Sequence, residues 1–132
     1  MFFMLNRGSK TPKVAIPLSS QIVGLEKCNK NIIVGCMDNC LYCYTTKGRR
    51  LWKIDLPSFI ITMSAMEIKS KGIQAVIVSL NNKEVHIYRD KYLISKLNVE
   101  DPVVGIKFGK FGREEGNLIM TTRSKLDLIT LG

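Results

Sequence analysis

The sequence has no long hydrophobic run and no helical periodicity that survives past two turns. None of its apolar runs reaches the roughly 18 residues that a membrane-spanning helix needs. The opening stretch MFFMLNRGSK has an apolar patch shorter than the core of a secretion signal, and no cleavage-site pattern follows it. With only 4 cysteines in 132 residues, a secreted disulfide scaffold is disfavoured. We therefore expect an intracellular domain with reduced thiols.

Catalytic motifs are also scarce. The chain has 1 histidine, His86, which lies in a strand-like run and is expected to be a satisfied or exposed strand residue rather than a catalytic base. The glycine-containing stretch GKFGREEG (109–116) lacks the Lys-Ser/Thr ending of a phosphate loop, and we interpret it as a long turn. No carboxylates are spaced for acid–base chemistry. We predict no catalytic residue, no cofactor site and a protein that is not an enzyme.

Three of the cysteines lie close together, at positions 36, 40 and 43. If residues 40–46 form a strand, successive side chains alternate between its two faces, so Cys40 and Cys43 point in opposite directions. A zinc site needs about four ligands that converge on one point. We therefore predict no metal site, and we expect these cysteines to be buried as small apolar residues.

The chain carries a net charge of +9. Nucleic acid, an anionic membrane surface and an acidic protein are all partners that such a charge favours. The basic residues are scattered, and KGRR (47–50), the one local cluster, is typical of a hairpin turn. Charges on solvated turns are the simpler explanation of this pattern.

Short apolar runs, rich in β-branched and aromatic residues, recur along the whole chain and predict β-strands. Between them, the pairs DN, KG, NN and RD are typical of tight turns. The runs are KVAIPL (13–18), QIVGLEK (21–27), NIIVGCM (31–37), CLYCYTT (40–46), RLWKIDL (50–56), FIITMSAM (59–66), IQAVIVSL (73–80), EVHIYR (84–89), YLISKL (92–97), VVGIKFG (103–109), NLIMTT (117–122) and LDLITL (126–131).

A longer repeat groups these strands. The pair IIVGC and LYCY is followed about 44 residues later by VIVSL and VHIY, and about 42 residues after that by LIMTT and LDLI. Four strands per repeat of this length are the signature of β-propeller blades. We predict an all-β fold: a partial β-propeller of about three four-stranded antiparallel blades, WD40-like or quinoprotein-like. An open solenoid or a sandwich is the alternative.

The expected boundaries are an N-terminal tail over residues 1–12 and a partial propeller over residues 13–132. Its blades span about 21–57, 58–98 and 102–132, and residues 13–18 form the outer strand of a preceding blade. Propellers close with about four to eight blades. We therefore expect the chain to be part of a larger ring, or to complete a ring with itself or another chain.

Several residues are predicted to fill the space within and between blades. Trp52 is expected to pack between blades, and the aromatic residues Phe59, Tyr88 and Phe108 lie in strand patterns typical of a core. A charge at a buried strand position such as Met120 is expected to be strongly destabilising. The predicted structural core is Cys36, Trp52, Val78, Phe108 and Met120.

Four stretches together resemble the Bardet–Biedl syndrome 1 protein family: YTTKGRRLW (44–52), GIQAVIVSL (72–80), EVHIYRDK (84–91) and VVGIKFGKFGREEGNLIMTTRSKLDLI (103–129). The most specific part is FGKFGREEGNLIMTTR (108–123). The resemblance runs from about residue 12 to the end and corresponds to the later blades of that family's N-terminal seven-bladed propeller. The family has GGG after TTR, where this chain has SKL, so the last hairpin is expected to differ.

The resemblance implies a non-enzymatic subunit of the BBSome, a coat-like complex that supports cilium assembly and moves membrane proteins into and out of cilia. The implied partners are other BBSome subunits, an Arf-like small GTPase in its GTP form, ciliary membrane-protein cargo and, through the complex, the membrane surface. The implied location is the cytoplasm, the cilium and its base or centrosome, and the ciliary membrane as a peripheral protein. Candidate contact residues on or near the loops of the last blade are Lys107, Lys110, Arg113 and Arg123.

A propeller of this kind has two alternative functions, an enzyme and a nucleic-acid-binding protein. A quinoprotein-like propeller enzyme would need a second G-x-x-L-W repeat and convergent acidic metal ligands, and the sequence shows neither. A nucleic-acid-binding propeller rests on charge alone, because the aromatic residues that would stack on bases are expected in the core. We therefore predict no nucleic-acid partner.

Overall fold

A computed structural model describes residues 2–5, 14–68, 72–111, 114–123 and 125–130. Within these ranges the chain is all β, as predicted, and no helix is long and apolar enough to cross a membrane. The strands are β1 (Phe2–Leu5), β2 (Val14–Pro17), β3 (Ile22–Cys28), β4 (Asn31–Cys36), β5 (Cys40–Thr45), β6 (Arg50–Asp55), β7 (Ile60–Ile68), β8 (Ile73–Leu80), β9 (Glu84–Arg89), β10 (Tyr92–Asn98), β11 (Gly105–Phe111), β12 (Glu114–Thr121) and β13 (Leu126–Thr130).

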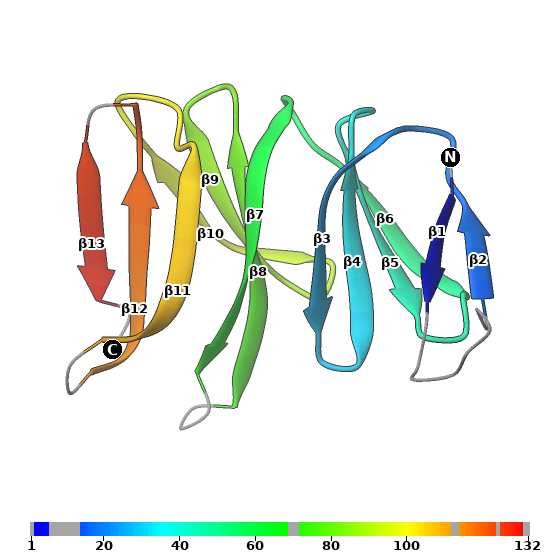
Figure 1. Cartoon of the computed structure of the whole chain (residues 1–132). Coiled ribbons are helices and arrows are strands. Elements are labelled where there is room, and N and C mark those ends of the chain that lie inside the picture. The colour runs from blue at the N-terminus through cyan, green and yellow to red at the C-terminus, as the bar shows by residue number, and fades with distance from the viewer. Residues whose placement is uncertain (1, 6–13, 69–71, 112–113, 124, 131–132) are drawn as a thin grey trace.

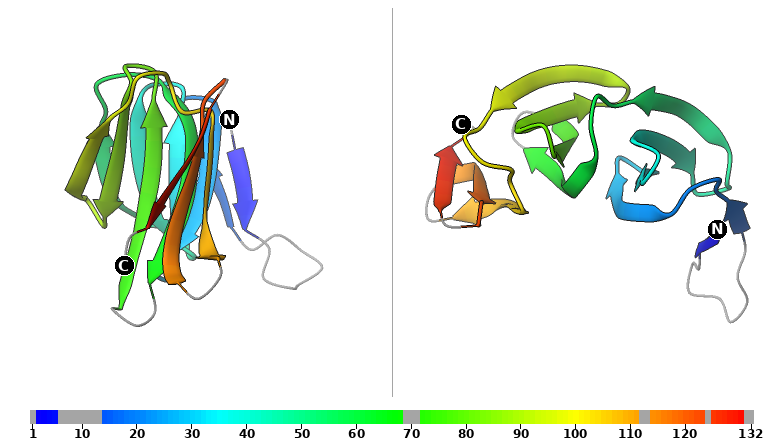
Figure 2. Two further views of the ribbon diagram at one scale, coloured as in Figure 1. Left: turned by 90° about the vertical axis from the view of Figure 1, so that its left-hand side faces the viewer. Right: turned by 90° about the horizontal axis from the view of Figure 1, so that it is seen from above.

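These strands form four separate antiparallel sheets that follow one another in the chain: β1–β2, β3–β6, β7–β10 and β11–β13. Each strand pairs with its neighbours in sequence, so every sheet is a simple meander (Figure 1). Seen from above, the sheets stand along an arc (Figure 2). The first strands β3, β7 and β11 lie side by side on its inner side, and β6 and β10 lie on its outer side. This is the blade arrangement of a partial β-propeller, which confirms the predicted fold class.

Tight turns join the strands at the dipeptides that the sequence marked. Asn39 of DN, Lys83 after NN and Asp90 of RD adopt positive φ angles of 63°, 66° and 54°. Gly48 of the KGRR turn has φ 90°. Asparagine, aspartate and glycine tolerate this left-handed conformation better than other residues, which explains Asn39, Asp90 and Gly48. At the remaining turn, Lys83 after NN adopts it in place of either asparagine.

The three larger sheets cover residues 22–55, 60–98 and 105–130, inside the blade ranges expected from the repeat. One expectation was wrong at the N-terminus. Part of the predicted tail, Phe2–Leu5, is strand β1, whose residues pair with those of β2 from Phe2 opposite Pro17 to Leu5 opposite Val14. The apolar run FFML has strand-forming residues, and the edge of β2 gives its backbone a partner.

The stretch 109–116 is not the long turn that was predicted. Strand β11 continues to Phe111 and β12 begins at Glu114, and these two residues are opposite each other in the ladder. The register shifts between Gly109 and Phe111, where β12 has one residue more than β11. The two strands pair again beyond this bulge, so the ladder does not end there. The glycines and charges had suggested a loop because they are poor strand formers, but the ladder continues through them.

The hydrophobic core lies between the sheets, in three clusters. The first fills the space between sheets β3–β6 and β7–β10, with Ile33, Leu41, Cys43, Leu56, Ile60, Met63, Val76, Val78, Leu80 and Tyr88. The second lies between β2 and sheet β3–β6, with Ile16, Leu18, Ile32, Val34, Cys36, Cys40, Tyr42 and Tyr44. The third joins sheets β7–β10 and β11–β13, with Met66, Ala75, Ile77, Val85, Ile87, Val103, Leu118 and Met120. Strands β4, β5, β8 and β9 are buried on both faces, which explains their nearly continuous apolar sequences.

Two specific contacts hold neighbouring sheets at close range. Gly24 and Gly35 are opposite each other on β3 and β4, and Met63 of the next sheet lies over both of them. Between the second and third large sheets, the buried Ser79 hydroxyl donates a hydrogen bond of 2.6 Å to the Val103 carbonyl. A buried hydroxyl needs such a partner, so this bond fixes the chain where it enters the last sheet.

The five residues predicted to form the core differ in how deeply they are buried. Cys36, Val78 and Met120 are buried, whereas Trp52 and Phe108 are half-buried and pack against the first and third clusters. Phe59, which was expected in the core, is 59% exposed, because it precedes β7 at the turn between two sheets. Its apolar character had suggested strand burial, but sequence alone did not show on which side of the strand boundary it lies.

Candidate functional site

The cysteines do not form a site with one another. Cys40 packs in the second cluster and Cys43 in the first, so the two lie on opposite faces of β5, as strand alternation predicts. All four cysteines are free thiols. Across the described ranges, no three His, Cys, Asp or Glu side chains gather closely enough to hold a metal ion. The thiols therefore act as apolar filling in the sheets.

Burial also makes these thiols unreactive near neutral pH. It raises the pKa of Cys36, Cys40 and Cys43 to about 11, and a hydrogen bond of 3.1 Å from the Cys40 thiol to the Asp55 carboxylate adds to this effect at Cys40. Desolvation disfavours the thiolate, which is the reactive form. A redox or metal-binding role for these residues finds no support in their electrostatics.

The raised pKa values predict a loss of stability at alkaline pH. In the unfolded chain these thiols ionise near pH 9, whereas in the folded protein they stay protonated up to about pH 11. Because the unfolded state then binds fewer protons, the free energy of unfolding falls as pH rises from 9 to 11 and is unaffected by these groups below pH 9. Urea denaturation across this pH range measures the slope. A variant with Cys36, Cys40 and Cys43 replaced by alanine has a flatter dependence; an equal slope would contradict the assignment to the thiols.

The single histidine belongs to a polar row on β9. His86 is buried, and its ring nitrogens lie 3.0 Å from the Tyr88 hydroxyl and 3.0 Å from a Glu84 carboxylate oxygen. The hydrogen bond with His86 is the main cause that lowers the pKa of Glu84, and Lys96 lies 3.5 Å from the other carboxylate oxygen. Both nitrogens of the ring are thus engaged, so the row fixes these side chains within the sheet.

The basic residues proposed as partner contacts lie apart from one another. Lys107 is exposed on β11, and Arg123 is exposed at the bend after β12. Lys110 lies within β11 rather than in a loop, because that strand is longer than expected. Arg113 lies outside the described residues. Of these four candidates, the structure describes the side chains of Lys107 and Arg123, and both are exposed.

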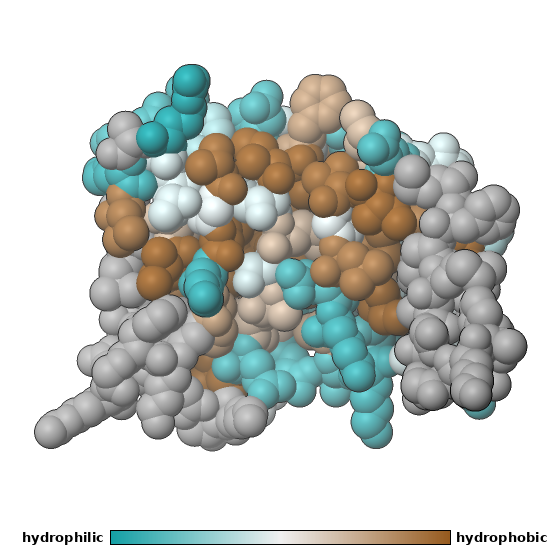
Figure 3. All heavy atoms as spheres, viewed as in Figure 1, coloured by the Kyte–Doolittle hydropathy of each residue, from teal (hydrophilic) through white to brown (hydrophobic). Residues whose placement is uncertain are grey.

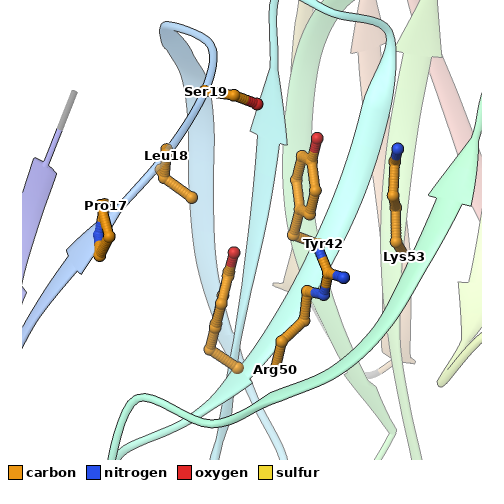
Figure 4. A pocket seen from close by; sticks show the side chains of 7 residues that line it. Pro17, Leu18, Ser19, Tyr42, Arg50 and Lys53 are labelled. Atoms are coloured by element: carbon orange, nitrogen blue, oxygen red, sulfur yellow. The ribbon is translucent and has the colours of Figure 1, made fainter.

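Sequence reasoning missed a groove between β2 and the first large sheet. Its cavity volume is about 290 Å³, and it is lined by Pro17, Leu18, Ser19, Tyr42, Tyr44, Arg50 and Lys53. Figure 4 shows the Tyr42 ring and the Arg50 and Lys53 side chains across from the segment Pro17 to Ser19. The KGRR cluster was the one feature of the sequence that pointed to this groove. The residues that line the groove with Arg50 come from β5 and from the segment at the end of β2, and the local sequence does not reveal that they lie together.

The inner side of the arc is hydrophobic in its upper part. Figure 3 shows a band of apolar side chains there, over the region of β3, β7 and β11. Large hydrophobic residues that stay exposed in these segments are Val23 and Leu25 of β3 and Val104 just before β11. A surface of this kind is suited to contact with protein rather than with a charged small molecule.

Comparison with known proteins places this arrangement among propellers. No family model matches the chain. The chain is 46% identical over 121 residues to "BBSome complex member BBS1" of mouse and to the human protein of the same name. The match covers 92% of this chain but 20% of either relative. The chain thus spans about a fifth of the length of the curated relatives it matches.

Solved structures agree with this result. The chain superposes with a TM-score of 0.86 and 37% identity on BBS1N in a crystal structure of its complex with ARL6DN, soaked with mercury, covering 94% of this chain and 40% of that one. BamB from Moraxella catarrhalis, at 15% identity and a TM-score of 0.64, shares the fold alone. The resemblance predicted from the sequence, to the later blades of a BBS1 N-terminal propeller, is therefore confirmed.

Proposed function

We propose that this chain, whose sequence and fold match the later blades of the BBS1 N-terminal propeller, is a non-enzymatic scaffold that works within a BBSome. There it supports the trafficking of ciliary membrane proteins and cilium assembly, with recruitment to the membrane through a small GTPase in its GTP form. The observation that carries the proposal is the match at 37% identity to a BBS1 domain crystallised in complex with ARL6DN. The proposed locations are the cytoplasm, the cilium and its base, and the ciliary membrane surface.

The physical properties of the chain support a scaffold. Its apolar residues are used to stack sheets against one another, so the blades form rigid supports for surface side chains. The net charge of +9 favours acidic proteins and anionic membrane surfaces as neighbours. In this proposal the other BBSome subunits and the membrane-protein cargo contact the complex as a whole, and this chain supplies one part of its propeller.

We also propose that the basic side chains of the last sheet contribute to partner contact. Lys107 and Arg123 are exposed and carry the charge that an acidic partner surface would meet. Lys110 and Arg113 belong to the same proposed group. Exposed ion pairs each contribute only about 0.2–1 kcal/mol, so the effect of any one of these residues is expected to be small.

The experiment that tests the function is capture by the GTPase. ARL6 loaded with GTP or GDP is immobilised, and two proteins are offered to it: this chain, and full-length mouse BBS1 in which this chain replaces the 121 matched residues. The expected result is capture of the chimera by the GTP form and not by the GDP form, together with its incorporation among the other BBSome subunits. A Lys107→Glu, Arg123→Glu chimera is expected to bind several-fold more weakly.

Native BBS1 is the positive control, and a chimera that carries the BamB segment of the same fold is the negative one. Failure of the folded chimera to join the complex would overturn the scaffold proposal. Assembly without GTP-dependent capture would remove the recruitment step and leave the scaffold role.

A further inference from the structure

The groove beside β2 brings two cations together through an irregularity of the sheet. Arg50 is opposite Tyr44 and Lys53 is opposite Tyr42, with a register shift between Cys43 and Tyr44. Residues three apart on a regular strand point to opposite faces. The extra residue, Leu51, restores them to the same face, so both cations lie beside the two tyrosine rings.

The cations of this groove have no carboxylate partner within the described part of the chain. Lys53 instead lies with its Nζ 5.8 Å from the centre of the Tyr42 ring. The acidic groups of the same face, Asp38 and Asp55, lie toward the other end: Asp38 accepts a hydrogen bond from the Tyr42 hydroxyl, and Asp55 accepts one from the Cys40 thiol. The groove therefore has a cationic end at Arg50 and an end where carboxylates are already engaged.

Apolar groups form the wall that faces the cations. Pro17 and Leu18 lie across from the strand side chains, as Figure 4 shows, and the rings of Tyr42 and Tyr44 stack with their centres 6.4 Å apart. A ligand that fills this space must combine a negative head group with an apolar stem. Both Arg50 and Lys53 are exposed, so such a ligand can reach them from solvent.

We propose that this groove binds a carboxylate side chain of an acidic segment from a partner protein. The carboxylate lies between the Arg50 guanidinium and the Lys53 ammonium, and its aliphatic stem packs on Pro17, Leu18 and the tyrosine rings. A guanidinium can hold a carboxylate with two parallel hydrogen bonds, which gives the site directional specificity. This surface belongs to the first large sheet and does not rest on the GTPase contact proposed for the last one.

A phosphate group fits the groove less well. It has no apolar stem to cover Pro17 and Leu18. The apolar wall of the groove therefore favours a carboxylate on an aliphatic stem.

The test uses the whole chain and fluorescein-labelled hexaglutamate, with labelled hexaglutamine as the neutral counterpart, in fluorescence anisotropy titrations at fixed ionic strength. Arg50→Gln and Lys53→Gln are each expected to weaken hexaglutamate binding about fivefold, the loss typical of a charge-assisted contact at a partly exposed site. Lys47→Gln and Arg49→Gln are the matched controls. Both residues are exposed in the same hairpin and do not line the groove, so each substitution removes one positive charge without changing the proposed site. Their effect is expected to stay below about twofold.

Equal weakening by all four substitutions would show attraction by net charge alone and would overturn the proposal, as would hexaglutamine binding as tightly as hexaglutamate. Competition separates the two anion chemistries: acetate and inorganic phosphate are added at equal ionic strength. Displacement by phosphate far beyond that by acetate would also overturn the carboxylate assignment. Unchanged thermal melting of each variant verifies that the fold is intact.

Discussion

Met120→Arg lowers the free energy of unfolding by about 3–5 kcal/mol, the expected cost of an unpaired charge in a core. Met120 is 3% exposed and lies in the cluster between the second and third large sheets, among apolar residues such as Ile77 and Val85. A domain of this kind has about 5–15 kcal/mol of stability in total, so a large fraction of it is lost. Urea denaturation at neutral pH measures the change.

Two controls isolate the buried charge. Met120→Leu keeps the volume and apolar character and is expected to cost less than about 1.5 kcal/mol. Leu126→Arg places the same cation on the same sheet, at a side chain that is 66% exposed, and is expected to leave stability within about 0.5 kcal/mol. A melting temperature of Met120→Arg equal to that of Leu126→Arg would contradict the burial of this position between sheets.

Gly35→Val is the second substitution with a large expected effect, a loss of about 2–3 kcal/mol from overpacking. A Cβ at this position would lie 2.5 Å from the Met63 sulfur and 2.8 Å from the Ile60 Cδ1, and both residues belong to the core cluster between the first two large sheets. The two sheets must therefore separate or their side chains must leave their preferred rotamers. Chemical denaturation compares the variant with the native chain.

A double-mutant cycle between Gly35 and Met63 tests the close approach of the first two large sheets. In a Met63→Ala background the space for the valine exists already, so the additional cost of Gly35→Val is expected to fall by at least about 1 kcal/mol. Gly72→Ala is the control glycine: it has open space around it and a φ of 63°, so backbone strain of about 1 kcal/mol is its only expected cost. Additive effects of Gly35→Val and Met63→Ala would refute the close approach of the sheets.

Much of the fold is readable from local chemistry. Runs such as IIVGC and VIVSL have the β-branched residues and length of buried strands, and DN and RD have the residues that accept the backbone angles of tight turns. The alternation of side chains along β5 separates Cys40 from Cys43, which excludes a shared ion at these two positions. Each of these inferences depends on residues only a few positions apart.

The groove was not predictable in this way. Arg50 and Lys53 share a face only because β6 has one irregular residue relative to β5, and the groove closes only because β2, more than 30 residues earlier, lies across from them. The exposure of Phe59 was not predictable either. Its aromatic side chain favours burial, but its position just before β7 leaves it exposed. Strand β11 likewise extends far enough to include Lys110 only because its pairing with β12 resumes beyond a register shift.

The sequence by itself determined most of the strands, though not β1 or the far ends of β11 and β12, and it determined the repeat of about forty residues that makes successive sheets into blades. Only the tertiary structure decided how those blades meet: the Gly24 and Gly35 recess that receives Met63, the Ser79 bond to Val103 and the two cations beside the tyrosines. The physical reason is that strand and turn preferences are set by neighbouring residues. Register and sheet packing are set by contacts between residues that are far apart in the chain, and no local pattern encodes them.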